Sequence, residues 1–200
     1  NRLISYYGVR PIEFTDFNDL HTIITSAFLH ADIWHLFFNM LFLYIYGDNI
    51  EAYLGRVNFI IFYALGGLSA ALLQSFVSGG MDVPMIGASG CISAVMGAYW
   101  VLYPKAKINV FLWIFIFIQF IKVPASIVIG FWILEQLISA GNGSYDGVAY
   151  FAHIGGFIFG YLGIKFFFKE YVQYEEISES DLPISRKNKS QGLTKDDSQN

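Results

Sequence analysis

Charged residues are scarce in this sequence. Only 14% of its 200 residues are Asp, Glu, Lys or Arg, whereas 55% are hydrophobic and 18% are aromatic; soluble proteins contain about 25% charged residues. The mean hydropathy is +0.48. So little charge predicts a membrane protein, with a lipid bilayer as its surroundings. The net charge of −4 gives no basic surface for nucleic acid.

Cysteine is almost absent as well. The single cysteine, Cys91, excludes an internal disulfide bond and leaves the redox compartment open. The sequence starts at Asn1 without a methionine and without the charged segment that precedes the apolar run of a signal peptide. We therefore expect the sequence to begin inside a longer protein.

Five apolar stretches are candidates for transmembrane helices, which need about 20 residues each. They are residues 33–50, 57–78, 86–103, 123–139 and 148–168. Residues 108–121 are also apolar, but they number only 14, and Lys122 and Pro124 argue against joining them to the next span. We expect an interfacial or partly buried connector there. The sequence therefore predicts an all-α membrane protein.

Three regions follow from this pattern. Residues 1–32 predict an outer interfacial loop with short helices, residues 33–168 the transmembrane core, and residues 169–200 a polar, disordered cytoplasmic tail. Positive charge in short loops marks the cytoplasmic side. One set of helix ends carries Arg56, Lys105, Lys107, Lys122, Lys165 and Lys169, whereas loops 79–85 and 140–147 have neither Lys nor Arg. Arg2 and Arg10 depart from this rule, as snorkelling interfacial arginines do.

Two polar residues lie near the outer ends of different spans. Ser89, within Gly87-Ala88-Ser89-Gly90, is a few residues into the third span, and His153 is about as far into the fifth. At a rise of about 1.5 Å per residue, both should lie roughly 5 to 10 Å below the outer surface. A serine at a helix entry is most often a cap or a packing residue. Cys91 points about 200° away from Ser89, so both cannot face His153.

Further polar residues enter from the same outer side. His35 and Asn39 are four residues apart, hence on one helix face, and His30 precedes them. Alone, such residues most often serve packing or hydrogen bonding, but their convergence with Ser89 favours a functional site. A metal site of His30, His35 and His153 is the alternative. We disfavour it because we find no carboxylate near that depth in these spans and no HExxH motif.

Small residues predict that the third and fifth spans approach closely. They are Gly90, Ala94 and Gly97 on one span and Gly155, Gly156 and Gly160 on the other. Such residues let helix backbones approach in a membrane. Close packing would let a short serine side chain reach an imidazole ring.

Taken in order, these motifs resemble those of the rhomboid intramembrane serine proteases over residues 11–168. The resemblance rests on the Ser89 tetrapeptide, on His30-x4-His35-x3-Asn39 and on Ala152-His153-Ile154-Gly155-Gly156. Residues 34–40 and 46–51, together with Trp132 and Gln136, fit the family as well.

The resemblance implies a rhomboid-like bundle of six helices, of which the first would be missing and five present. It implies a dyad without an acid, with Ser89 as nucleophile and His153 as general base. His35 and Asn39 would stabilise the oxyanion, and His30, Gly87 and Gly90 would support the site. No metal and no cofactor is implied. The substrates would be transmembrane segments of membrane proteins, cleaved near the outer face; in a bacterium the location would be the plasma or inner membrane.

One residue departs from the family pattern. Ser93 stands where many members carry an aromatic ring against the catalytic histidine, so we expect weaker orientation of His153 or a ring from elsewhere. A catalytically inactive rhomboid-like protein that binds transmembrane helices is the main alternative. A solute transporter would instead place its polar residues near the membrane midplane, within inverted repeats.

Overall fold

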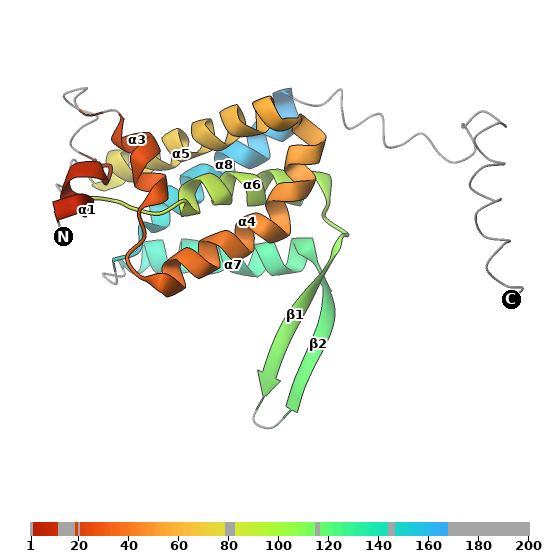
Figure 1. Cartoon of the computed structure of the whole chain (residues 1–200). Helices are drawn as coiled ribbons and strands as arrows, with labels where there is room; N and C mark the ends of the chain where they lie inside the picture. Colours follow the sequence, from red (N-terminus) through yellow and green to blue (C-terminus); the bar gives the residue numbers. More distant parts are fainter. Residues whose placement is uncertain are drawn as a thin grey trace, which may run out of the picture.

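The computed structural model describes residues 2–11, 19, 21–78, 83–114, 117–143 and 147–167, without the side chains of 112–114, 117, 118 and 167. The predicted tail, 169–200, lies outside these residues. The described part contains five helices of 14 residues or more: α4 (Ile33–Leu54), α5 (Arg56–Ser78), α6 (Ser89–Leu102), α7 (Ala125–Gly141) and α8 (Tyr150–Phe167). Figure 1 shows them as a bundle in which α6 contacts the other four. Both ends of each helix lie within four residues of the ends of a predicted span. The prediction of a mostly helical fold is therefore confirmed.

The number of membrane spans stays a prediction. Among the described residues, α5 is the one helix that is long and apolar enough to cross a membrane by itself. The segment Thr22–Phe28 and α4 qualify only as a pair, bent by 101°. With 14 residues, α6 is about 21 Å long, which is less than the hydrocarbon thickness of about 30 Å.

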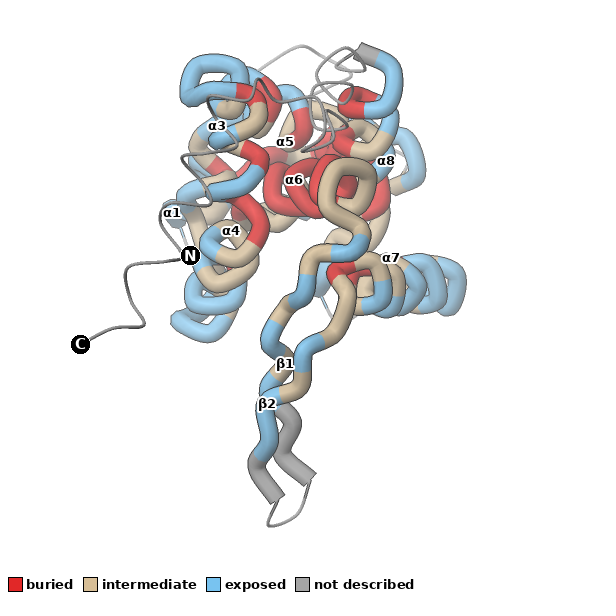
Figure 2. The backbone as a smooth tube through the Cα atoms, turned by 90° about the vertical axis from the view of Figure 1, so that its right-hand side faces the viewer, coloured by how far each residue is buried: buried red, intermediate tan, exposed pale blue. Residues whose placement is uncertain are grey.

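Residues 108–121 differ from the prediction. Residues 108–114 and 117–121 belong to an antiparallel hairpin of β1 (Lys107–Ile114) and β2 (Phe117–Pro124), so the all-α prediction is wrong for these two strands. The physical reason is their composition, since β-branched and aromatic residues favour strands. The hairpin leaves the bundle between α6 and α7 and projects beyond the helices (Figures 1 and 2).

The central helix packs against α8 backbone to backbone. Residues 91–99 of α6 are all buried, as Figure 2 shows. A Cβ atom at Gly156 would overlap the carbonyl oxygen of Gly90, and one at Gly160 would overlap that of Ala94. The predicted close approach of these two helices is therefore confirmed. Gly155 is an exception, because it faces α5, where an added Cβ would lie 2.8 Å from Leu73 Cβ.

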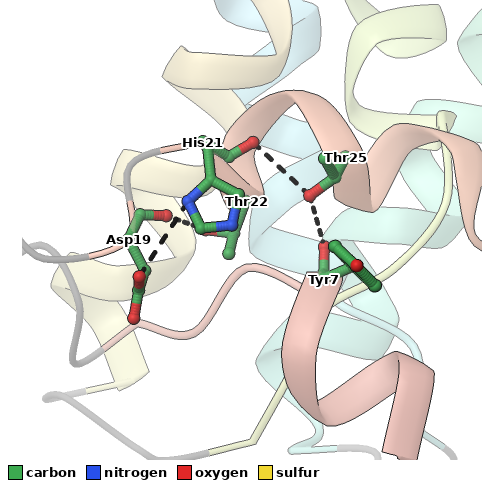
Figure 3. A network of polar contacts seen from close by, with 5 residues as sticks. All are labelled: Tyr7, Asp19, His21, Thr22 and Thr25. Atoms are coloured by element: carbon green, nitrogen blue, oxygen red, sulfur yellow. Dashed lines mark hydrogen bonds and ion pairs between the residues drawn. The ribbon is translucent and has the colours of Figure 1, made fainter.

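The N-terminal segment folds over the end of the bundle where α6 begins. Its short elements are α1 (Arg2–Tyr7), α3 (Thr22–Thr25) and the 3-10 helix η1 (Ser26–Phe28). Figure 3 shows the contacts that join them: the Thr25 hydroxyl donates to the Tyr7 carbonyl at 2.8 Å, and the Thr22 hydroxyl donates to the Asp19 carbonyl at 2.7 Å. The Thr25–Tyr7 bond joins α3 to α1, whereas the Thr22–Asp19 bond is local to the start of α3.

The same segment holds the loop that precedes α6. The backbone N–H of Gly87 donates to the Ser26 carbonyl at 2.9 Å, and Val9 and Met85 exchange backbone hydrogen bonds of 3.1 and 2.7 Å. The N-terminal segment therefore fixes where the polypeptide enters α6, two residues before Ser89.

The glycine contact between α6 and α8 generates a stability prediction. Gly160→Ala should lower the free energy of unfolding by about 1 to 3 kcal/mol, because its Cβ must displace the Ala94 backbone. The control is Gly163→Ala, where the added Cβ would lie 3.5 Å from Phe62, an ordinary contact. Thermal unfolding in detergent micelles should show a lower midpoint for Gly160→Ala only. Equal midpoints would contradict the close approach.

Candidate active site

The structure brings Ser89 and His153 into hydrogen-bond contact. Ser89 is the first residue of α6, and His153 lies in the first turn of α8. The Ser89 Oγ atom is 2.8 Å from His153 Nε2. This contact depends on the backbone packing of the two helices, because a serine side chain reaches only a short way from its own backbone.

Helix α7 fixes the orientation of the imidazole through Gln136. His153 Nδ1 lies 2.6 Å from Gln136 Oε1, and the Gln136 side chain is only 4% exposed. Gln136 Nε2 donates to the Glu135 carboxylate, whose other oxygen accepts from the Ser139 hydroxyl at 3.0 Å. An ionised carboxylate only accepts, so the amide nitrogen of Gln136 must face Glu135 and its oxygen must face His153.

This arrangement determines the tautomer of His153. Because Gln136 presents an oxygen, His153 Nδ1 carries the proton and donates it. His153 Nε2 then holds a free lone pair and accepts the hydroxyl proton of Ser89. A base in contact with the nucleophile, oriented by a third group, is the arrangement that activates a weak nucleophile.

Helix α7 also supplies an aromatic ring that packs against His153, in place of the ring that many family members carry at the position of Ser93. The Trp132 ring lies 5.8 Å from the His153 ring at an interplanar angle of 37°, and Tyr150 meets it edge-on at 6.5 Å. Ser93 instead donates to the Ser89 carbonyl at 2.6 Å. The expected substitute ring is thus Trp132, four residues before Gln136 and so on the same helix face.

His35, on α4, lies beside the loop that precedes Ser89. Asp32 caps that helix, since its carboxylate accepts the N–H groups of Trp34 and His35 at 2.8 and 2.9 Å. His35 Nδ1 accepts the Ala31 N–H at 3.3 Å, so the proton of a neutral ring is on Nε2. That atom lies beside Gly87, whose φ is +107° and whose added Cβ would lie 2.7 Å from it. Glycine at this position therefore leaves room for His35.

Asn39 and His30 adjoin His35. Asn39 is 4% exposed, and its amide donates to the His35 carbonyl at 2.8 Å, which uses one of its two N–H donors. The His30 ring packs edge-on against His35 at 5.1 Å. Burial lowers the pKa of His30, and the neighbouring His35 lowers it further, so His30 is uncharged at neutral pH.

Beside Ser89 lies a cavity of about 50 Å³. It extends between α5, α6 and the N-terminal segment and is lined by Ser26, Gly87, Ser89, Cys91 and Ala152 among others. This volume can hold a few water molecules. Cys91 is buried, and its sulfur lies beside Gly67 of α5, on another side of α6 from His153.

Two residues of this network were not predicted from the sequence as parts of the site. Gln136 was singled out only through the family resemblance, and Glu135 was not predicted at all; it lies on α7, outside the spans of the three histidines, and is linked to His153 through Gln136 by two hydrogen bonds. The available signal was a Glu-Gln pair near the outer end of an apolar span, where ionisable residues are costly and often functional. Within the described residues, no group of three His, Cys, Asp or Glu side chains could hold a metal ion.

The fold is a helical bundle with a serine–histidine pair at one end. Residues 18–170 match the Rhomboid domain, and the chain belongs to the rhomboid family. Most members of this family are intramembrane serine proteases, and they act on membrane-protein substrates in a bilayer.

Two curated proteins illustrate the similarity. The chain is 32% identical over 149 residues to Rhomboid protein 1, mitochondrial, of Saccharomyces cerevisiae. The alignment covers 70% of this chain and 40% of that protein. The chain is also 32% identical over 155 residues to RHOMBOID-like protein 12, mitochondrial, of Arabidopsis thaliana, covering 68% and 43%. The chain thus spans about two fifths of the length of these relatives.

The hydrogen bond to Gln136 generates a spectroscopic prediction. Nitrogen-15 NMR of histidine-labelled protein should show His153 with a protonated Nδ1 and an unprotonated Nε2. Gln136→Leu removes the acceptor and should give a mixture of tautomers, whereas Gln136→Glu keeps an acceptor and should preserve the Nδ1–H form. An unchanged spectrum in Gln136→Leu would exclude the orienting role of this residue.

Proposed function

We propose that the protein is an intramembrane serine endopeptidase that cleaves transmembrane segments of membrane proteins. The observation that carries this proposal is the hydrogen-bonded series Ser89, His153, Gln136, with 2.8 Å and 2.6 Å between successive members. It gives a nucleophile, a base in the tautomer that can accept the nucleophile's proton, and a group that holds the base. Membership of the rhomboid family adds the reaction class.

In the proposed mechanism, Ser89 Oγ attacks the carbonyl carbon of the scissile peptide bond while its proton moves to His153 Nε2. The tetrahedral intermediate collapses, the carbon–nitrogen bond breaks, and His153 returns the proton to the leaving amine. A water molecule then attacks the acyl-enzyme, with His153 again as base, and Ser89 is released. The cavity beside Ser89 provides a place from which that water could come.

The negative charge of the intermediate needs hydrogen-bond donors. The N–H groups of the first turn of α6, Ser89 included, have no acceptor within the helix, and the helix dipole favours an anion there. His35 contributes its Nε2–H and Asn39 the N–H that does not bond His35. Each such donor is typically worth about 3 kcal/mol of transition-state stabilisation.

Substrate entry is proposed past α7. Phe131 on this helix is 75% exposed, and Trp132 beside it packs on His153. A transmembrane substrate would approach from the lipid and unwind locally, because a helical backbone hides its carbonyl groups from attack. The proposal places cleavage near the outer face and the segment 169–200 in the cytoplasm, as the loop charges indicate.

A catalytically inactive, helix-binding rhomboid is the competing function. An inactive protein does not require hydrogen bonds that join Ser89 to His153 and His153 to Gln136. Here both hydrogen bonds are present. This geometry favours the protease.

The direct test is cleavage of a transmembrane reporter by the purified chain in proteoliposomes. Ser89→Ala and His153→Ala should each lower kcat by about 10⁴-fold or more, and a fluorophosphonate probe should label Ser89 only in the parent protein. Ser75→Ala is the control, since it removes the hydroxyl of another helical serine, which donates to the Ala71 carbonyl at 2.7 Å and not to a histidine. Activity that survives Ser89→Ala, or that a chelator abolishes, would reject the dyad.

The oxyanion role of His35 gives a second kinetic prediction. His35→Ala should lower kcat by about 10²- to 10³-fold with little change in KM, because the donor acts on the intermediate rather than on the bound substrate. His21→Ala removes an exposed histidine from the N-terminal segment and serves as control. A change confined to KM would assign His35 to substrate binding instead.

A further inference from the structure

The β1–β2 hairpin lies across the direction of the helices. In Figure 1 the long helices run from left to right while the hairpin points down, and in Figure 2, which looks nearly along the helices, it still points down beyond them. Its base lies in the chain between the end of α6 and the start of α7. This end of the bundle carries Lys105, Lys107, Lys122 and Lys165. The far ends of both strands lean toward the end where α6 begins (Figure 1). If the helices cross a bilayer, the base of the hairpin lies at its surface and the far ends of the strands slope toward its interior.

The side chains of the hairpin change in character from base to tip. Lys105, Lys107 and Lys122 at the base are all exposed, and residues 105–124 contain no Asp or Glu. Further out, Phe111 and Phe120 form a cross-strand pair with ring centroids 5.3 Å apart, and they are 52% and 68% exposed. The sequence from 111 to 118 is apolar at every position.

Neither water nor hydrocarbon suits this element. In water, an apolar two-stranded hairpin with free edges is a template for aggregation. In hydrocarbon, the unpaired N–H and C=O groups along the outer edges of two strands would have no hydrogen-bond partner. The interface between headgroups and acyl chains satisfies both requirements, because it hydrates the edges and accepts the aromatic rings.

We propose that the hairpin binds the surface of an anionic phospholipid bilayer on the cytoplasmic side. Phe111 and Phe120 insert below the headgroups. Lys105, Lys107 and Lys122 contact the anionic headgroups, which attract basic residues at that leaflet. The proposal rests on the membrane orientation given by the loop charges and is independent of whether the chain is a protease.

The test is an environment-sensitive fluorophore at Phe120→Cys, in a Cys91→Ser background, with the protein in nanodiscs. Two reference labels calibrate the signal: Phe131→Cys on the exposed face of α7, and Asn142→Cys in an exposed turn. In discs containing phosphatidylglycerol, the label at 120 should emit at nearly the wavelength of the Phe131 reference. It should also be protected from aqueous iodide, and spin labels near the headgroups should quench it more than spin labels at the acyl-chain ends.

The lysines give the matched comparison. Each Lys→Gln change among the three should weaken the partition of the hairpin into the anionic surface by about fivefold, with no change in discs of phosphatidylcholine alone. If the variant with all three Lys→Gln changes lacks a thermal transition, it is unfolded. In that case, added salt must weaken the partition of the unaltered hairpin in the same way, because salt screens the lysine charges.

Two results would overturn the proposal. One is iodide quenching at position 120 equal to that at 142 in both kinds of disc, which would place the hairpin in water. The other is an intermolecular disulfide formed through unlabelled Phe120→Cys in the same discs, which would assign the hairpin to pairing with a second copy of the chain.

Discussion

The backbone contact between α6 and α8 is the constraint on which the rest of the structure depends. No side chain separates the two helices where Gly156 meets Gly90 and where Gly160 meets Ala94. In a membrane, where apolar side chains gain little by leaving lipid, such contacts are a main source of helix association. They also determine the distance between Ser89 and His153, because these residues begin the same two helices. Stability and the candidate chemistry thus share one interface.

Helix α7 packs less extensively, since among its residues only Ala125, Ile129 and Gln136 are buried. Gln136 and Trp132 lie one turn apart and meet His153 by a hydrogen bond and a ring contact, while much of the rest of α7 is exposed. A larger cavity of about 430 Å³, lined by Trp100, Leu137 and Phe157 among others, separates part of α7 from α6 and α8. Loosely packed elements open at low free-energy cost. The helix that contacts His153 through Gln136 and Trp132 is therefore less tightly packed than α6.

The sequence predicted what depends on single helices and on local pattern. The helix positions followed from apolar runs, and the approach of α6 to α8 followed from glycine spacing. The shared depth of Ser89 and His153 followed from the helical rise, and the structure places these two side chains together; their roles remain a proposal. The hairpin within 108–121 was missed although its composition favours strands, because a short apolar run becomes a strand only with a pairing partner, as Phe111 has in Phe120. Glu135 is visible in the sequence as an ionisable residue in an apolar span, but its link to His153 passes through the amide of Gln136, whose orientation has no sequence signal.

The connection between α4 and α5 has a mechanical consequence. A single residue, Gly55, separates the two helices, with φ at +77° and no neighbour within 4 Å of an added Cβ. His35 is at the opposite end of α4, about 30 Å away along the helix axis. Over such a lever arm, a tilt of about 5° at Gly55 displaces His35 by about 3 Å, which is enough to remove a hydrogen-bond donor from its acceptor. A tilt of α4 about Gly55 would thus move His35 without altering the distance between Ser89 and His153, because those two residues lie on α6 and α8.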